Sequence, residues 1–190
     1  MKQMKSHKNN KRFNYAWKIF RDIRDKKENI DKIESENEKI DNLIREISTS
    51  FNQSNTLNRI GMDLFEKKQY IKAVSFFQKA IKQFPENSSA LFNLGECYLS
   101  LSKYDESIEC FKQILYKFPE HIPAKNRIAY ALWKKKEFEG ARQIYLAILN
   151  LAPDQRGVLL DLGRLSMDMH RYNEGIKCMQ RVSEIKSTAE

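Results

Sequence analysis

Glycine and proline are scarce in this sequence, with 6 Gly and 4 Pro among 190 residues. The sequence also lacks the alternating runs of Val, Ile and Thr that are typical of half-buried strands. No uninterrupted apolar run approaches the roughly 18 residues that span a bilayer. The charged N-terminus has no apolar stretch of the kind found in a signal peptide. We therefore expect an all-α protein with no membrane-spanning helix.

Cysteine is equally rare, and its spacing argues against a common type of metal site. Cys97, Cys110 and Cys178 lie in segments with helical patterns, and no two of them have the close Cys-x₂₋₄-Cys spacing of zinc sites. The sequence contains neither an H-E-x-x-H pair nor a glycine-rich phosphate loop. We predict reduced thiols, a cytoplasmic location, no metal, no cofactor and no enzymatic activity.

A pattern of 34 residues is written four times between residues 54 and 189. Three of the prolines, Pro85, Pro119 and Pro153, lie 34 residues apart. The same interval separates four small residues and four aromatic residues: Gly61, Gly95, Ala129 and Gly163, and Tyr70, Tyr104, Phe138 and Tyr172. A period in this range indicates stacked repeats rather than one globular core.

Each copy contains two amphipathic helical patterns with a short polar turn between them. In the first copy, Leu57, Ile60 and Leu64 have spacings of three and four, which place them on one face of a helix. Ala73 and Phe77 begin the corresponding stripe of the second helix. Proline closes the unit because it cannot continue a helix and restrains the residue before it.

This pattern resembles the tetratricopeptide repeat, which places a large residue, Leu-Gly, Tyr, Ala, Phe, Ala and Pro at set positions over 34 residues. The resemblance implies a superhelical solenoid of helix-turn-helix repeats, with copies at 54–87, 88–121, 122–155 and 156–189. The fourth copy departs most, since Ser166 replaces a large residue and Ser187 replaces the closing proline. We expect it to be a degenerate end repeat.

In that family the first helices of the repeats line a concave groove, so the resemblance implies a site for a protein or peptide partner. The partner-binding candidates at groove positions are Asn58, Arg59, Asn93, Asn126, Arg127, Tyr130, Trp133 and Arg164. Asn and Arg can hydrogen-bond a peptide, and rigid aromatic residues often become binding hot spots. The alternative is that these are ordinary exposed helix residues.

Some members of the family carry a clamp for the carboxylate of a chaperone C-terminus. Two of its five positions match here, at Asn93 and Arg127, whereas Asn58, Met62 and Pro123 occupy the other three. We therefore expect a different peptide.

Charge is distributed unevenly before the repeats. The net charge of the chain is +9, yet residues 1–27 alone hold ten basic and two acidic residues, and residues 28–53 hold three basic and seven acidic residues. We expect 1–11 to be a disordered basic tail. From residue 12, an apolar stripe with Phe13, Trp17 and Phe20 adjoins Lys18 and Arg21, as in helices that lie on anionic membranes or dock on a partner. Packing on another copy or on the first repeat is the alternative, and nucleic acid is not expected.

A heptad pattern continues this segment to about residue 51, so 12–51 is predicted to be a basic amphipathic helix followed by a short coiled coil. Alternating a and d positions include Ile33, Asn37, Ile40, Ile44 and Ile47. This helix could self-associate, making a homo-oligomer, or fold back and cap the repeats. Residues 48–50 and 52–55 are polar, and we expect them to form a joint before the repeats.

These patterns predict a non-catalytic scaffold or adaptor that binds a partner segment in the groove. One alternative is a self-assembling coat at a membrane surface, anchored by the basic N-terminal helix. A chaperone for a secreted client is the third hypothesis.

Overall fold

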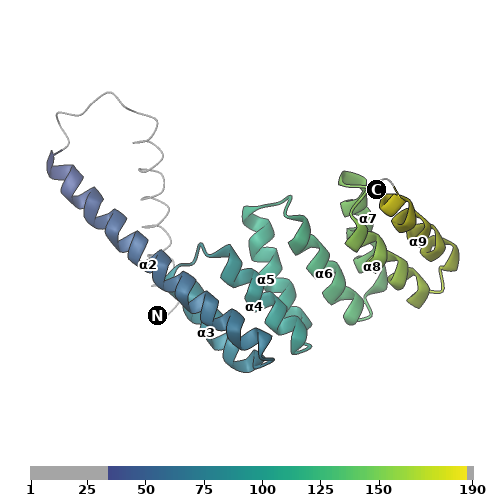
Figure 1. Cartoon of the computed structure of the whole chain (residues 1–190), viewed down its shortest axis with the longest axis horizontal. Coiled ribbons are helices and arrows are strands. Elements are labelled where there is room, and N and C mark those ends of the chain that lie inside the picture. The colour runs from purple at the N-terminus through teal and green to yellow at the C-terminus, as the bar shows by residue number, and fades with distance from the viewer. Residues whose placement is uncertain (1–33, 188–190) are drawn as a thin grey trace.

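The computed structural model describes residues 34–187, with side chains from residue 42 to residue 185. This part of the chain consists of eight helices and no strand, which confirms the all-α class. The helices lie side by side in an elongated array, and the N-terminal half of α2 projects from one end (Figure 1). The helices are α2 (Glu34–Glu66), α3 (Tyr70–Gln83), α4 (Ser88–Ser100), α5 (Tyr104–Lys117), α6 (Ile122–Lys134), α7 (Phe138–Leu151), α8 (Arg156–Asp168) and α9 (Tyr172–Ser187).

Consecutive helices pack as antiparallel pairs, and each pair packs on the next, as expected for a repeat solenoid. The core is a string of clusters between the pairs. Phe77, Phe111 and Tyr145 occupy equivalent positions in the first three copies, and all three are fully buried. Gly61 and Gly95 make room for the first two of these rings, because a Cβ at either glycine would lie 2.6 Å from a ring carbon.

The turn within each pair contains one residue in the left-handed region. These residues are again 34 apart, and none is glycine: Lys68, Ser102, Lys136 and His170, with φ between 58° and 66°. The next residue donates its N–H to a carbonyl five positions earlier, as in the bond from Lys103 to Tyr98 at 2.8 Å. This is the 6→1 bond of a Schellman motif, which satisfies a carbonyl left free at the helix end.

The three repeat prolines each follow the end of a second helix, as the sequence predicted. The residues before them, Phe84, Phe118 and Ala152, have φ between −140° and −127° and ψ between 79° and 96°. These extended conformations are the ones that a following proline favours. In the fourth copy, where Ser187 replaces the proline, α9 continues to that residue.

The polar joint predicted at residues 48–55 is wrong, because α2 runs through it without interruption. The segment has no glycine or proline to break a helix, and its polar side chains are used within the fold. Thr49 donates to the carbonyl of Arg45 at 2.8 Å, and the fully buried Ser54 donates to the carbonyl of Ala80 at 2.8 Å. A buried serine that ties two helices together therefore lies where the composition indicated a linker.

Other N-terminal predictions fall on residues 1–33, outside the described residues. They are the basic tail, the amphipathic segment with Phe13, Trp17, Phe20, Lys18 and Arg21, and the start of the coiled coil. Within 34–187, no helix is long and apolar enough to cross a membrane. The three cysteines are free and buried, and burial raises the pKa of Cys97 and Cys110 to about 12.

Candidate functional site

The predicted partner-binding residues lie on the first helices of the repeats, α2, α4, α6 and α8. We call the surface they form with their polar neighbours the first-helix face. It comprises Asn58, Arg59, Asn93, Glu96, Asn126, Arg127, Tyr130, Trp133, Asp161, Arg164 and Asp168. Contacts between α2 and α4 and between α6 and α8 bring these residues together across repeats.

Two equivalent pairs of polar side chains join neighbouring repeats on this face. Asn93 Nδ2 donates to Asn58 Oδ1 at 3.0 Å between the first and second copies. Asn126 and Asp161 occupy the same two positions in the third and fourth copies, and the Asn126 side chain opposes the rise in the pKa of Asp161. Each pair joins position 5 of one repeat to position 6 of the next. The asparagines thus help to align the repeats as well as lining the face.

Arg127 forms an ion pair within the array. Its Nε lies 2.7 Å from Oε1 of Glu96, across the junction between the second and third copies. The clamp-like residues of the sequence, Asn93 and Arg127, are therefore both paired within the array, to Asn58 and to Glu96. This pairing agrees with the expectation that the site is not a carboxylate clamp.

An aromatic patch lies beside these polar residues at the end of α6. The rings of Tyr130 and Trp133 meet edge to face with centroids 5.9 Å apart, and Lys134 Nζ lies 5.3 Å and 5.7 Å from the two centroids. Trp133 Nε1 donates to Asp168 Oδ2 at 2.8 Å. Both aromatic side chains are partly exposed, so the patch combines a fixed orientation with surface that a partner can cover.

Two buried polar atoms at this site, Asn126 Oδ1 and the hydroxyl of Tyr145, have no hydrogen-bond partner among the described residues. A third such atom, Glu96 Oε1, forms the ion pair with Arg127. Tyr145 is fully buried, and its hydroxyl interacts electrostatically with Asp161 and Arg127. Burial and the nearby Asp161 raise the pKa of Tyr145, so the hydroxyl keeps its proton. Such atoms usually bond to water or to a ligand.

The carboxylates of the face are partly desolvated. Burial raises the pKa of Glu96 and of Asp161, while Arg127 opposes the shift in both. Arg164 lies 4.0 Å from Asp161, and its side chain is 66% exposed. Arg59 is exposed on α2. Of the predicted set, therefore, the residues on α6 and α8 form one connected cluster, and Asn58 and Asn93 form a separate pair.

Tyr145 and Asp168 belong to the site but were not among the predicted site residues. Tyr145 fits the core pattern of the second helices, so its hydroxyl gave no signal in the sequence. Asp168 occupies position 13 of the fourth copy, a groove position in the family, and that position could have identified it.

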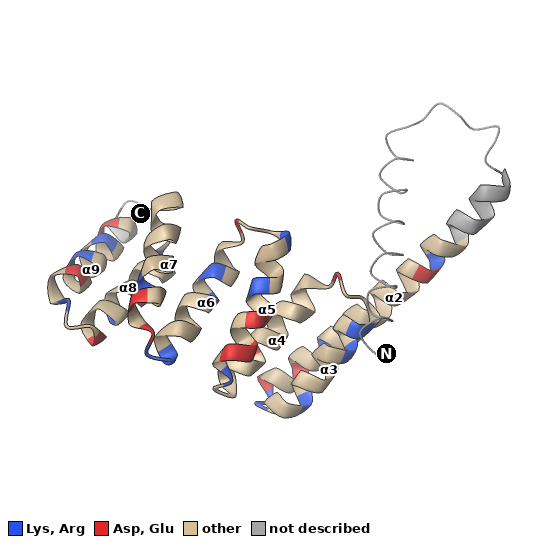
Figure 2. Cartoon of the chain, turned by 180° about the vertical axis from the view of Figure 1, so that it is seen from behind, with Lys and Arg blue, Asp and Glu red and all other residues tan. Residues whose placement is uncertain are grey.

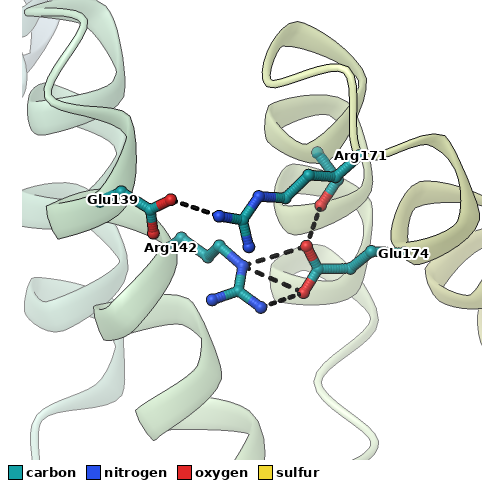
Figure 3. A network of polar contacts seen from close by, with 5 residues as sticks. Glu139, Arg142, Arg171 and Glu174 are labelled. Atoms are coloured by element: carbon teal, nitrogen blue, oxygen red, sulfur yellow. Dashed lines mark hydrogen bonds and ion pairs between the residues drawn. The ribbon is translucent and has the colours of Figure 1, made fainter.

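A second polar network, which the sequence did not indicate, joins the third and fourth copies through their second helices. Arg142 on α7 makes a bidentate contact with Glu174 on α9, with Nη2 to Oε1 at 2.7 Å and Nε to Oε2 at 3.0 Å (Figure 3). Arg171 reaches back to Glu139 at 2.5 Å. Each cation is matched by a carboxylate, so this network is a junction between repeats rather than an anion site.

Charge is mixed over the rest of the array. Basic and acidic residues are scattered over the array in Figure 2, and this view shows no face of one sign. Within the described residues, no group of His, Cys, Asp and Glu has the arrangement of a metal site.

Comparison with known proteins agrees with this geometry. Two family models described as tetratricopeptide repeat match residues 64–126 and 98–156. A Triticum aestivum Hsp70-Hsp90 organizing protein is 22% identical over 129 residues, which are 68% of this chain and 22% of that protein. The chain thus spans about a fifth of the length of that relative.

Solved structures with the same fold are similar over most of the chain. MamA from Desulfovibrio magneticus RS-1 superimposes with a TM-score of 0.66 at 18% identity, covering 72% of this chain and 77% of that one. The first TPR of Spaghetti (RPAP3), bound to the HSP90 peptide SRMEEVD, gives a TM-score of 0.58 at 19% identity. That match covers 63% of this chain and 95% of the RPAP3 chain.

Proposed function

Because this chain is a tetratricopeptide repeat protein, we propose that it is a non-catalytic interaction scaffold that binds a peptide segment or helix of a partner along the first-helix face. The observation that carries the proposal is the aromatic patch of Tyr130 and Trp133, which is partly exposed at the end of α6. On the same helix, the Asn126 side chain interacts with Asp161 of the next repeat, and its buried Oδ1 has no hydrogen-bond partner among the described residues.

The aromatic patch supplies the apolar part of the proposed site. Tyr130 and Trp133 contact each other edge to face and are partly exposed, and residues of these types often dominate binding energy. The exposed Arg164 guanidinium, on the next repeat, is available to a partner carboxylate or carbonyl. The proposed segment therefore offers an apolar side chain to the patch and a carboxylate or carbonyl acceptor to Arg164.

The test compares two double variants in co-purification from the native cell. Tyr130→Ala with Arg164→Ala removes binding groups that take little part in joining the repeats. The matched control, Tyr116→Ala with Lys112→Ala, removes an aromatic and a cation from the exposed side of α5, where Tyr116 is 92% exposed. We expect a discrete set of proteins to be lost with the first variant only. Equal recovery from both variants would contradict the proposal.

Direct binding then tests the geometry. Trp133 fluorescence should change when the captured segment is added, and the double variant should bind at least about tenfold more weakly, since a single hot-spot residue is worth about 2 kcal/mol or more. The proposed compartment is the cytoplasm, which the three free thiols favour.

Self-assembly of the repeats, at a membrane surface or free of it, is the second candidate function. It is favoured by large apolar side chains that are exposed outside the first-helix face, including Ile71 at 76% and Leu151 at 60%. A scaffold with a bound segment should stay a small, defined homo-oligomer or monomer. A coat should grow in mass as its concentration rises, and light scattering separates the two.

A further inference from the structure

The N-terminal half of α2 carries an apolar surface that no described helix covers. Its partly and well exposed members are Leu43, Ile44, Ile47 and Phe51, which we call the α2 stripe. Ile44 is 38% exposed and Phe51 is 45% exposed. These residues have the three and four spacing of one helix face.

The end of α3 defines where coverage of α2 stops. The Phe51 ring meets that of Phe84 with centroids 5.4 Å apart, and Gln83 Nε2 donates to Gln53 Oε1 at 2.6 Å. Ser54, one turn further on, is fully buried against the carbonyl of Ala80. The α2 stripe therefore continues the buried side of α2 past the last residues of α3, and Figure 1 shows this half of α2 projecting beyond the array.

We propose that residues 12–24 pack as a helix on the α2 stripe, antiparallel to α2. The apolar residues of this segment, Phe13, Trp17 and Phe20, recur at helical spacing. At 1.5 Å per residue, a 13-residue helix is about 20 Å long, and α2 from residue 34 to residue 50 offers about 25 Å. The residues between 24 and 34 are enough for a turn back, since helix hairpins commonly use two to eight.

The charge distribution favours residues 12–24, rather than a second copy of α2, as the segment that covers the α2 stripe. Residues 1–27 carry ten basic and two acidic residues, whereas residues 28–53 carry three basic and seven acidic ones. Residues 12–24 themselves hold four basic and one acidic residue, and residues 34–50 hold two basic and five acidic ones, so the fold-back places a segment of net charge +3 against one of −3. Pairing two copies of α2 along the stripe would place −3 against −3, which opposes association. Docking also withdraws the apolar side of the basic segment from any membrane surface.

The test uses Trp17 as the probe in the full-length chain. Trp133→Phe leaves Trp17 as the one remaining tryptophan of two, and quenching by acrylamide then reports its exposure. We expect Trp17 to be shielded at low protein concentration and without lipid. Ile44→Glu, on the stripe, should raise the quenching constant at least about twofold and shift the emission to longer wavelength.

Matched variants separate docking from damage to the fold. Ile71→Glu changes an equally apolar residue on α3 that is 76% exposed, and it should leave the quenching constant unchanged. Phe13→Ser with Phe20→Ser changes only the docking segment, so it cannot disturb the repeats, and it should expose Trp17 as Ile44→Glu does.

Three results would overturn the proposal. One is that Trp17, in the protein with an unaltered α2 stripe, is quenched as readily as in the urea-unfolded chain. Another is shielding that grows with protein concentration together with a dimer mass in light scattering, which would assign the stripe to a second copy. The third is shielding that occurs only with anionic phosphatidylserine vesicles, which would assign the segment to a membrane surface.

Discussion

The ring of Phe111 occupies the space that a side chain at Gly95 would need, with ring carbon Cζ 2.6 Å from the position of a Cβ. Gly61 and Phe77 repeat the relationship one copy earlier at the same distance. Both rings are fully buried, so neither can move aside. The small residue of the 34-residue pattern is thus required by close packing of the first helix on the second.

Gly95→Ala should lower the free energy of unfolding by about 1–3 kcal/mol, as overpacking of a rigid core does. Gly157→Ala is the matched control, because a Cβ at Gly157 meets nothing within 4 Å in the first turn of α8. It should raise stability by up to about 1 kcal/mol through helix propensity. Urea unfolding measures both. Equal effects of the two substitutions would show that helix propensity, and not the ring, decides the outcome.

Lys68→Gly should stabilise the protein by about 0.5–1 kcal/mol, because Lys68 has φ 58° and glycine takes this conformation without steric cost. Lys79→Gly serves as control in the interior of α3, where the same change should cost about 1 kcal/mol. Thermal unfolding of both variants gives the comparison. A Lys68→Gly variant that is less stable than the parent would refute the argument.

The helix pairs and their ends could be predicted because their causes are local. Proline at 34-residue intervals and apolar spacing of three and four act within one repeat, whatever the neighbours do. The left-handed turn residues were not predicted, since lysine, serine and histidine carry no sign of that conformation. The prediction of a joint at residues 48–55 was wrong because Ser54 gains its buried partner, the carbonyl of Ala80, only when α3 packs against α2.

The positions of the candidate site residues could be predicted from the sequence, but the pairings of their side chains could not. The family resemblance directed attention to Asn126, Arg127, Tyr130 and Trp133. Which of their groups stay available depends on pairings to residues 31 or 35 positions away, such as Arg127 with Glu96 and Trp133 with Asp168. Those pairings follow from how one repeat stacks on the next, which a periodic sequence does not specify for each side chain.

Asp161→Asn should stabilise the protein at neutral pH. Burial raises the pKa of Asp161 above its value in the unfolded chain, so the stability it contributes is present below the unfolded pKa and is lost as pH rises through the folded pKa. The amide removes this loss because it has no charge to desolvate. The difference in unfolding free energy between variant and parent should therefore be positive at pH 7 and shrink as pH falls toward 3. A difference that does not change with pH would mean that the carboxylate charge is not its cause.

The junction between the third and fourth repeats should depend on the Arg142–Glu174 pair, with side chains only 23% and 24% exposed. A double-mutant cycle with Arg142→Met and Glu174→Gln should give a coupling energy of about 0.5–1.5 kcal/mol at pH 7. Arg142 lowers the pKa of Glu174, so this stability is present above the unfolded carboxyl pKa and is lost as pH falls through the folded pKa. The coupling should accordingly decline in acid.

Arg181 and Asp154 provide the control for that cycle, because they join the same two repeats at 2.9 Å but with side chains 51% and 68% exposed. Exposed single contacts of this kind are worth about 0–1 kcal/mol, so their coupling should be the smaller of the two. If the two pairs couple equally, the bidentate geometry and partial burial of Arg142 contribute nothing to the junction. If Arg142 and Glu174 couple more strongly, this network holds the last repeat, which has no closing proline, on the array that carries the proposed binding site.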